Sequence, residues 1–382
     1  MDIDIAASED IDVDALVDVG ADVDAYEGVD TGAGVDVGAD VDAYEGADTG
    51  AGADAYAGSD TSAGADVDAG ASDKGLKLRF AHITVDDQQM FTEFFNSINP
   101  SVSDYTFSNL FIWRRMANYR YTWINGFLCI VALPYKYPPY AFAPAGDMSD
   151  KKGFISAVLA LYNYSIDRGW TPRFRFVPKD AAQAIMEAIP NCKCVPDRDF
   201  FDYVYLAEDL INLKGKKYDG KRNHINKFKS TYEYEYERVT TDAQLEECFR
   251  IMRDRCVEKN CNCLKGMYYS CDRKPNMELL SNYDKLNCVG GIIKVNGRYE
   301  GFSIGAPLNS NTAVVFIEKA NVSINGLYPF LNQQFCAHEW SGMTYINREE
   351  DEGVEGLRKA KLSYHPAMMM EKFTIALQQP LA

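Results

Sequence analysis

Asn287-Cys-Val-Gly-Gly-Ile-Ile-Lys-Val-Asn-Gly-Arg-Tyr-Glu-Gly-Phe-Ser-Ile-Gly-Ala-Pro307 contains two apolar runs that are separated by Asn296-Gly297. Asn-Gly between two runs of strand-forming residues is a strong signal for a two-residue β-hairpin, because both turn residues need positive φ. A second pair, Asn125-Gly126, separates similar runs in the first half of the chain. The sequence therefore predicts one β-hairpin in each half.

The elements predicted around the two hairpins follow a similar order, in which strands alternate with helices. In the first half they are residues 76–83, 86–98, 119–133, 151–168, 173–177, 180–189 and 200–206. In the second half they are residues 232–239, 242–259, 287–307, 312–319, 326–340, 343–347 and 354–362. We therefore expect an α/β (α+β) chain with two similar domains, 76–212 and 231–382, each a mixed sheet flanked by helices. A basic helix at 213–230 is expected to connect them.

The first 73 residues differ in composition from the rest of the chain. They contain 21 Asp or Glu and no Lys or Arg, whereas the whole chain has 56 acidic and 39 basic residues and a net charge of −17. The other 309 residues therefore hold 35 acids and all 39 bases, a net charge of +4. A segment with so few large apolar side chains gains too little from burial to offset its chain entropy. We expect residues 1–75 to form a disordered acidic tail.

The acidic tail repeats itself, since residues 22–34 recur with one change at residues 40–52. Alternating Asp and Gly resemble calcium-loop chemistry. The bidentate Glu at the twelfth loop position and the Gly-Gly-x-Gly-x-Asp nonapeptide are both missing, however. We interpret the tail as a solvated low-complexity repeat. A functional role for the repeat itself remains an alternative.

Composition also bears on localisation and on metal binding. No stretch approaches the ~20 consecutive apolar residues that cross a bilayer, and the first residues lack the pattern of a signal peptide. We therefore expect a cytoplasmic protein with no membrane insertion and with reduced cysteines. The densest cysteine group lacks the two Cys-x(2–4)-Cys pairs of a structural zinc site, so no metal is expected there: Cys256, Cys261, Cys263 and Cys271.

The densest polar group follows the predicted strand at 343–347. It places amide, acidic and basic side chains on a turn and on the helix after it: Asn347, Arg348, Glu349, Asp351, Arg358, Lys359 and Lys361. Arg358 and Lys361 share a helix face, and Leu357 and Leu362 are expected to hold the helix on the sheet. Such a layout suits a phosphate or carboxylate ligand. A solvated acidic turn followed by a basic helix end is the alternative.

A second polar group lies between the two predicted domains, at residues 213–229. It is rich in Lys and has Ile225 and Phe228 at helical spacing to anchor one side. Basic residues around a few aromatic ones suit a nucleic-acid backbone, so RNA is a candidate partner. A basic linker helix that keeps the two halves soluble is the alternative. The sequence has no nucleophile elbow, Walker loop or dinucleotide fingerprint, which argues against hydrolases, nucleotidases and dehydrogenases.

The chain resembles the family named for the C-terminal domain of phosphatidylglycerol lysyltransferase. The resemblance covers about residues 76–376 and is carried by four segments: residues 105–113, 221–228, 316–320 and 347–364. It implies two tandem acyltransferase folds of the GCN5-related type, similar to the peptidoglycan aminoacyltransferases. The implied activity is transfer of an acyl or aminoacyl group to an amine or hydroxyl acceptor.

The resemblance also implies roles for particular residues. In this fold the donor carbonyl is polarised by a backbone N–H where two central strands separate. Glu318 would then be the base and Tyr364 the acid, and Asn347, Glu349 and Asp351 would complete the catalytic set. The residues expected to bind substrate lie on the connecting helix, at a helix N-terminus and in the polar group after the last strand: Lys221, Arg222, Asn223, Asn325, Gly326, Arg348, Arg358, Lys359 and Lys361.

The acyl donor can be inferred from a motif that this chain lacks and that other enzymes of this fold have. Users of acetyl-coenzyme A carry a Gln/Arg-x-x-Gly-x-Gly/Ala loop, whereas residues 320–328 contain Gly326 alone. Aminoacyl-tRNA therefore fits better as a donor substrate, with tRNA as a partner and no permanently bound cofactor. An acetyl-coenzyme A-dependent N-acetyltransferase and a non-catalytic RNA-binding module remain alternatives. Lipid lysylation is not expected, because the chain lacks the membrane-spanning half of the lipid-modifying enzymes.

Overall fold

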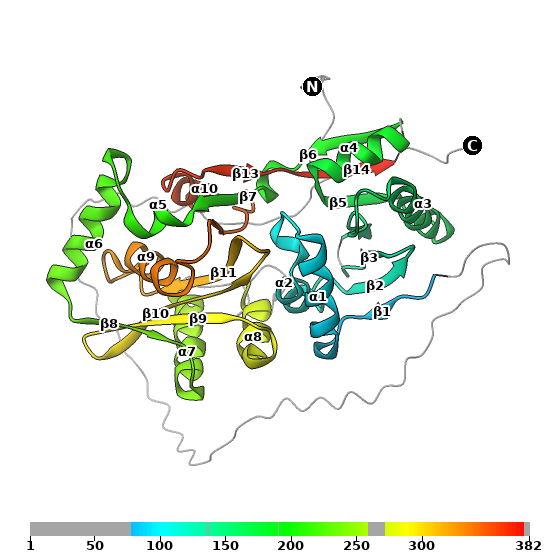
Figure 1. The fold of residues 1–382 in the computed structure, drawn as a ribbon. Helices are drawn as coiled ribbons and strands as arrows, with labels where there is room; N and C mark the ends of the chain where they lie inside the picture. The colour runs from blue at the N-terminus through cyan, green and yellow to red at the C-terminus, as the bar shows by residue number, and fades with distance from the viewer. Residues whose placement is uncertain (1–77, 136, 190, 259–271, 378–382) are drawn as a thin grey trace, which may run out of the picture. The chain divides into compact units, whose positions relative to one another are not determined.

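The computed structural model describes residues 78–135, 137–189, 191–258 and 272–377, and Figure 1 shows their arrangement. In this part of the chain helices flank two mixed β-sheets, so the expected α/β class with mixed sheets flanked by helices is confirmed. The predicted disordered tail, residues 1–75, lies outside the described residues. In the described part, no helix is both long enough and apolar enough to cross a membrane.

The first sheet has the strand order β1–β2–β3–β4–β5–β14–β6. Its strands are β1 (Ala81–His82), β2 (Tyr119–Ile124), β3 (Phe127–Ala132), β4 (Tyr140–Ala141), β5 (Arg173–Pro178), β14 (Lys372–Leu377) and β6 (Cys192–Pro196). The Asn-Gly turn joins β2 and β3, and Asn125 and Gly126 both have positive φ, as a two-residue hairpin needs. Helices α3 (Lys151–Asp167) and α4 (Lys179–Ala188) bury their apolar side chains against this sheet.

The second sheet has the strand order β13–β7–β12–β11–β10–β9–β8. Its strands are β13 (Met368–Met370), β7 (Asp202–Leu206), β12 (Tyr345–Asn347), β11 (Thr312–Ala320), β10 (Arg298–Pro307), β9 (Val289–Val295) and β8 (Tyr234–Arg238). One face is covered by helices α5 (Ala207–Asn212), α6 (Asp219–Thr231) and α9 (Leu327–Glu339). Helix α10 (Glu355–Leu362) follows β12.

A third apolar core contains residues from both halves of the chain, including Phe91, Phe111, Met252 and Phe302. Its helices are α1 (Gln88–Ile98), α2 (Phe107–Trp113), α7 (Asp242–Glu258) and α8 (Arg273–Ser281). Helix α2 packs on α8, and Arg114 at its end donates to Glu278 at 2.9 Å. The two sheets therefore belong to one packed unit.

The two sheets exchange strands. In Figure 1 the chain passes from β6 to β7 and, beside it, from β13 to β14. Strand β7 pairs with β12 and β13 of the second sheet, while β14 pairs with β5 and β6 of the first. The boundary expected at residues 212–231 therefore does not divide the sheets, because β7 lies before it and β14 after it.

Three other details differ from the sequence-based expectation. The strand expected at 76–83 is described only as Ala81–His82, and the buried helix α2 was not predicted. Leu357 and Leu362 were expected to hold α10 on the sheet, but they are 40% and 44% exposed. Helix α10 is held instead by hydrogen bonds from the side chains of Arg358 and Lys361. Polar anchors replace the apolar face because the surface beneath this helix is a loop with carboxylate and carbonyl acceptors.

Candidate functional site

The candidate site begins where two central strands of the second sheet separate. Strands β11 and β12 pair in parallel only from Thr312 to Val314, opposite Tyr345 to Asn347. Strand β12 then ends, while β11 continues to Ala320. The pairing of β11 with β10 shifts register between Ile304 and Gly305, and such an irregularity bends a strand. The far part of β11 thus has no strand partner on its β12 side among the described residues.

An ion pair spans the gap between these strands. Arg348, the first residue after β12, donates through Nη2 to Oε2 of Glu318 on β11 at 2.7 Å. Both side chains are about nine-tenths buried, at 14% and 13% exposure. Burial opposes the charge of Arg348, but the Glu318 carboxylate outweighs it and raises the pKa of the guanidinium. The other terminal nitrogen, Nη1, is buried and has no hydrogen-bond partner in the described part of the chain.

Tyr364 and Lys221 lie against this ion pair. The Nζ of Lys221 is 4.0 Å from the centre of the Tyr364 ring, and the guanidinium carbon of Arg348 is 5.0 Å from the same centre. Burial raises the pKa of the Tyr364 phenol. Burial and the nearby Arg348 lower the pKa of Lys221 to about 8. The structure therefore brings together four predicted site residues that are far apart in sequence: Lys221, Glu318, Arg348 and Tyr364.

Asp351 anchors the loop between β12 and α10. Its side chain is fully buried and accepts from Arg358 at 2.9 and 2.7 Å, from the Tyr203 hydroxyl at 2.5 Å and from the backbone N–H of Gly353 at 3.0 Å. Burial opposes the ionised form, but these hydrogen bonds lower the pKa of the carboxyl. Arg198 adds a further contact at 3.2 Å. Asp351 and Arg358 thus bind each other and hold the loop that carries Arg348.

The same loop is also held by the side chains of Asn347 and Lys361, and it contains Glu349. The amide of Asn347 donates to Asp202 at 2.9 Å, and its oxygen accepts from the backbone N–H of Glu349 at 2.8 Å. Lys361 donates to the backbone carbonyls of Arg348, at 2.6 Å, and Glu350. Burial and the neighbouring Glu350 raise the pKa of Glu349, whose φ is also positive. Glu349 also accepts from the amide of Asn109 on α2 at 3.3 Å, so all three side chains already have partners in the fold.

Lys372, which the sequence analysis did not single out, sits at the point where the strands are exchanged. It is the first residue of β14 and is completely buried. Its Nζ contacts Asp104 at 2.6 Å, Asp202 at 2.7 Å and Glu350 at 3.7 Å. Burial raises the pKa of Asp104 to about 6, although Lys372 opposes the rise. Sequence spacing gave no signal for this cluster, because its members come from separate parts of the chain.

The N-terminus of α9 is covered by the backbone of α6. Gly326 has φ 86°, and a Cβ there would lie 2.4 Å from the backbone oxygen of His224. Asn325 contacts the His224 ring at 3.3 Å. Pro329 in the first turn of α9 has no N–H to donate. This end of α9 therefore offers little room and few donors for a diphosphate.

The remaining predicted residues lie outside the four-residue cluster. Arg222 donates to the backbone carbonyls of Leu213 and, at 2.8 Å, of Gly215, so it fixes the start of α6. Asn223 is exposed on the same helix. Lys359 is exposed on α10 and pairs with Glu355 at 2.6 Å.

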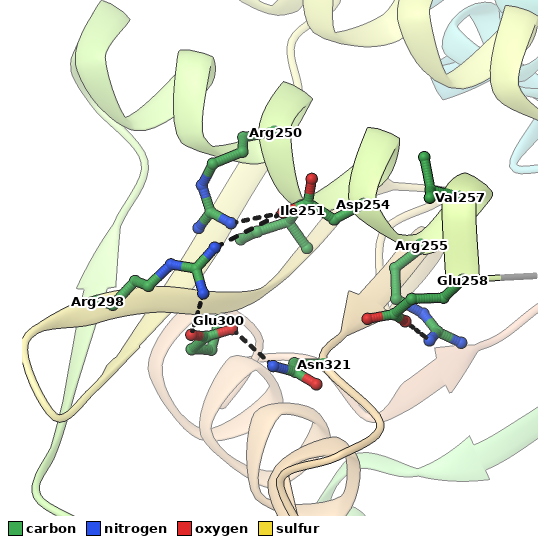
Figure 2. A pocket seen from close by; sticks show the side chains of 9 residues that line it. All are labelled: Arg250, Ile251, Asp254, Arg255, Val257, Glu258, Arg298, Glu300 and Asn321. Carbon is green, nitrogen blue, oxygen red and sulfur yellow. Dashed lines mark hydrogen bonds and ion pairs between the residues drawn. The ribbon is translucent and has the colours of Figure 1, made fainter. Parts of the chain in front are cut away.

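A separate hollow lies at the end of α7, away from the predicted residues, and Figure 2 shows its lining. Its charges neutralise one another: Arg298 contacts Glu300 at 3.2 Å, and Glu300 accepts from Asn321 at 3.0 Å. No group of three metal-binding side chains occurs in the part of the chain that the structure describes. Of the cysteine group considered above, Cys261, Cys263 and Cys271 lie outside that part.

The sequence matches one protein family over most of its length. Residues 95–376 match the family described as "Phosphatidylglycerol lysyltransferase, C-terminal". The stretch includes both sheets' central strands and all four residues of the cluster. The expected family resemblance is therefore confirmed.

Comparison with solved structures and curated proteins gives relatives at several distances. A conserved protein of unknown function from Bacteroides thetaiotaomicron is 34% identical, with a TM-score of 0.72 and coverage of 78% of this chain and 99% of that one. L-PGS from Bacillus licheniformis is 13% identical, with a TM-score of 0.55 and coverage of 77% and 93%. An uncharacterized protein from Mycoplasmoides gallisepticum is 24% identical over 183 residues, which is 46% of this chain and about half, 55%, of that protein.

Proposed function

Since this chain belongs to the family of the phosphatidylglycerol lysyltransferase C-terminal domain, we propose that it transfers an aminoacyl or acyl group to an amine or hydroxyl acceptor. The observation that carries the proposal is the gap between β11 and β12, with Glu318 and Arg348 paired across it. An unpaired strand edge offers backbone N–H groups to a carbonyl oxygen, and a buried guanidinium with a free N–H adds a charged donor. Both stabilise the oxyanion of an acyl-transfer intermediate.

The proposed roles follow from the contacts. The donor carbonyl lies at the edge of β11, and Arg348 donates through Nη1 to the oxygen as negative charge develops. Glu318 holds Arg348 in place. The Tyr364 hydroxyl lies in the same cluster and donates to the leaving oxygen. Glu349, Asp351, Arg358 and Lys361 keep the loop rigid, which preserves the position of Arg348 within the tolerance that transfer needs.

We propose an aminoacyl ester of tRNA as the donor. Helix α6 presents exposed Lys and Asn side chains next to the cluster, and such a surface attracts a phosphate backbone. The diphosphate of coenzyme A would need the N-terminus of α9, where Gly326 lies against α6. These two features favour aminoacyl-tRNA over acetyl-coenzyme A as the donor.

The test compares the two candidate donors, charged tRNA and acetyl-coenzyme A. Purified protein is incubated with tRNA charged with a mixture of labelled amino acids, or with labelled acetyl-coenzyme A, in an extract that supplies acceptors. We expect label from tRNA to enter a ribonuclease-resistant product, and the acetyl label to stay on its carrier. Transfer from acetyl-coenzyme A alone would support the acetyltransferase alternative. The absence of transfer from both donors would contradict the proposed activity.

A second function is favoured by the exposed basic side chains of α6, which suit RNA binding without catalysis. In that case Lys227→Ala and Lys229→Ala, at two exposed positions of α6, weaken tRNA binding in a salt-dependent manner, while Tyr364→Ala leaves tRNA binding and the function of the protein unchanged. Under the transferase proposal, Tyr364→Ala removes transfer even though tRNA still binds. A filter-binding titration at two salt concentrations, followed by the transfer assay, separates the two functions.

A further inference from the structure

We infer that Lys221 is the proton acceptor of the proposed transfer, with Glu318 serving only to hold Arg348. The inference rests on the proposed function and deepens it, because the family resemblance implies substrate binding for Lys221 and the role of base for Glu318. It is based on where the Lys221 amine lies and on what surrounds it.

The start of α6 is fixed against the cluster, so Lys221 is held in position. The buried Tyr218, just before α6, donates its hydroxyl to the backbone oxygen of Tyr364 at 3.0 Å. Lys221 follows in the first turn of α6 and places Nζ 4.0 Å from the centre of the Tyr364 ring. The ring itself packs edge-on against Tyr205, with centres 6.4 Å apart. The amine therefore lies over the Tyr364 ring, near enough to the ion pair for both of its charges to act on it.

No carboxylate or carbonyl of the described residues accepts a hydrogen bond from this amine. Glu318, the nearest carboxylate of the cluster, is engaged by Arg348. The Tyr364 ring and Glu318 favour the ammonium, but without a hydrogen-bond acceptor they do not offset its burial and the charge of Arg348, so the pKa of the amine is lowered. The lone pair of that amine is free to take a proton.

Two charged groups act on Lys221, Arg348 after β12 and Glu318 of β11, and the ring of Tyr364 after α10 lies beside its amine. Tyr205 of β7 and Cys336 of α9 act on Arg348 in turn. Burial and Arg348 lower the pKa of Lys221 and Glu318 partly opposes them, so that the pKa is about 8. Roughly a tenth of the protein would hold the uncharged amine at neutral pH, which is enough for a general base.

The proton transfers balance over one turnover. As the acceptor's nitrogen or oxygen bonds to the donor carbonyl carbon, its proton passes to Nζ of Lys221 and the carbonyl π pair moves to oxygen. The oxyanion accepts from Nη1 of Arg348 and from the β11 edge. When the intermediate collapses, the carbon–oxygen bond to the tRNA ribose breaks. The Lys221 ammonium returns its proton to the departing oxygen, to which the Tyr364 hydroxyl also donates a hydrogen bond, and the neutral amine is restored.

The test compares Lys221→Arg with a matched control, Lys152→Arg, on the exposed side of α3. Arginine keeps the positive charge but cannot lose its proton at any pH used in the assay. Under our inference Lys221→Arg retains tRNA binding and loses turnover by about 10²- to 10⁴-fold. The wild-type rate rises with pH to a plateau above about pH 8, since the active form is deprotonated. Lys152→Arg should match the wild type both in turnover and in the pH dependence of the rate.

A second measurement does not depend on turnover. Trace acetic anhydride labels uncharged amines, and mass spectrometry of the peptide that contains Lys221 gives its titration, with the Lys152 peptide as reference. We expect half-maximal labelling of Lys221 near pH 8. Labelling that begins only above pH 10, or a Lys221→Arg variant that turns over like the wild type, overturns the inference. A wild-type protein that never consumes charged tRNA contradicts the proposed function instead, and the labelling then decides the state of Lys221.

Discussion

At the scale of single residues, the four side chains of the cluster show which parts of the site can be predicted from the sequence. The family resemblance predicts Glu318, Arg348, Tyr364 and Lys221 as site residues, and the structure brings them together. Their partners were not predictable. Asp351 is expected in the catalytic set, yet its burial and its contacts with Arg358 and Tyr203 make it an anchor.

The phenol of Tyr364 can be tested without disturbing its ring. Tyr364→Phe keeps the surface on which Lys221 and Arg348 lie and removes only the hydroxyl. We expect the transfer rate to fall about 100-fold, as when one hydrogen-bond donor is removed from an active site. The thermal unfolding midpoint should change little, because no described residue depends on that hydroxyl for a hydrogen bond. An unchanged rate would rule out a role for the phenol.

Arg358 is expected to matter for stability. In Arg358→Met the buried Asp351 carboxylate loses its bidentate partner, so the free energy of unfolding should fall by about 2 to 3 kcal/mol. Lys359→Met on the same helix breaks only an exposed pair and should cost less than about 0.5 kcal/mol. Urea unfolding followed by circular dichroism measures both. Equal effects of the two variants would contradict the role of Asp351 as an anchor.

At the scale of elements, the periodicity predicted most helices and both hairpins, but it could not assign each strand to a sheet. The run Asp202–Leu206 alternates as a strand should, and nothing in that alternation tells which sheet it joins. The sheet that this run joins depends on contacts at the place where the chain crosses between the sheets. There Lys372 contacts Asp202 and Asp104. Such a contact joins residues that are distant in sequence, so a single sequence does not reveal it.

The strand exchange should depend on Lys372. Lys372→Met leaves the buried carboxylates of Asp104, Asp202 and Glu350 without their cation, and we expect a loss of about 3 to 5 kcal/mol at pH 7. Lys179→Met, which breaks an exposed pair with Glu371, is the control and should cost less than about 1 kcal/mol.

The loss should also depend on pH, because protonation removes the uncompensated charge. The pKa of Asp104 is raised to about 6, above the unfolded value of about 3.9, so the folded state binds this proton more tightly. That contribution to stability is present at low pH and is lost as pH rises through about 4 to 6. Lys372→Met should therefore be less destabilising at pH 4.5 than at pH 7. A penalty that grows on acidification would contradict this account.

At the scale of the whole molecule, the charge is divided between the acidic first 73 residues and a remainder with a net charge of +4. Deleting residues 1–73 should leave the unfolding midpoint of the rest unchanged. It should also tighten tRNA binding in 50 mM salt, because an anionic segment is removed from a cationic surface. The difference should shrink at 300 mM salt, where charges are screened. Filter binding at both salt concentrations measures it, and a lower unfolding midpoint or weaker binding after deletion would contradict the expectation.

The central claim is that the cluster between β11 and β12 carries the transfer. The most direct measurement is the single-turnover rate at which labelled aminoacyl-tRNA loses its amino acid to an acceptor in the presence of wild-type protein or Arg348→Met, with folding checked by circular dichroism. The account predicts a wild-type rate far above that of tRNA alone and a rate close to that background for the folded variant. An Arg348→Met protein that transfers as fast as the wild type would contradict it.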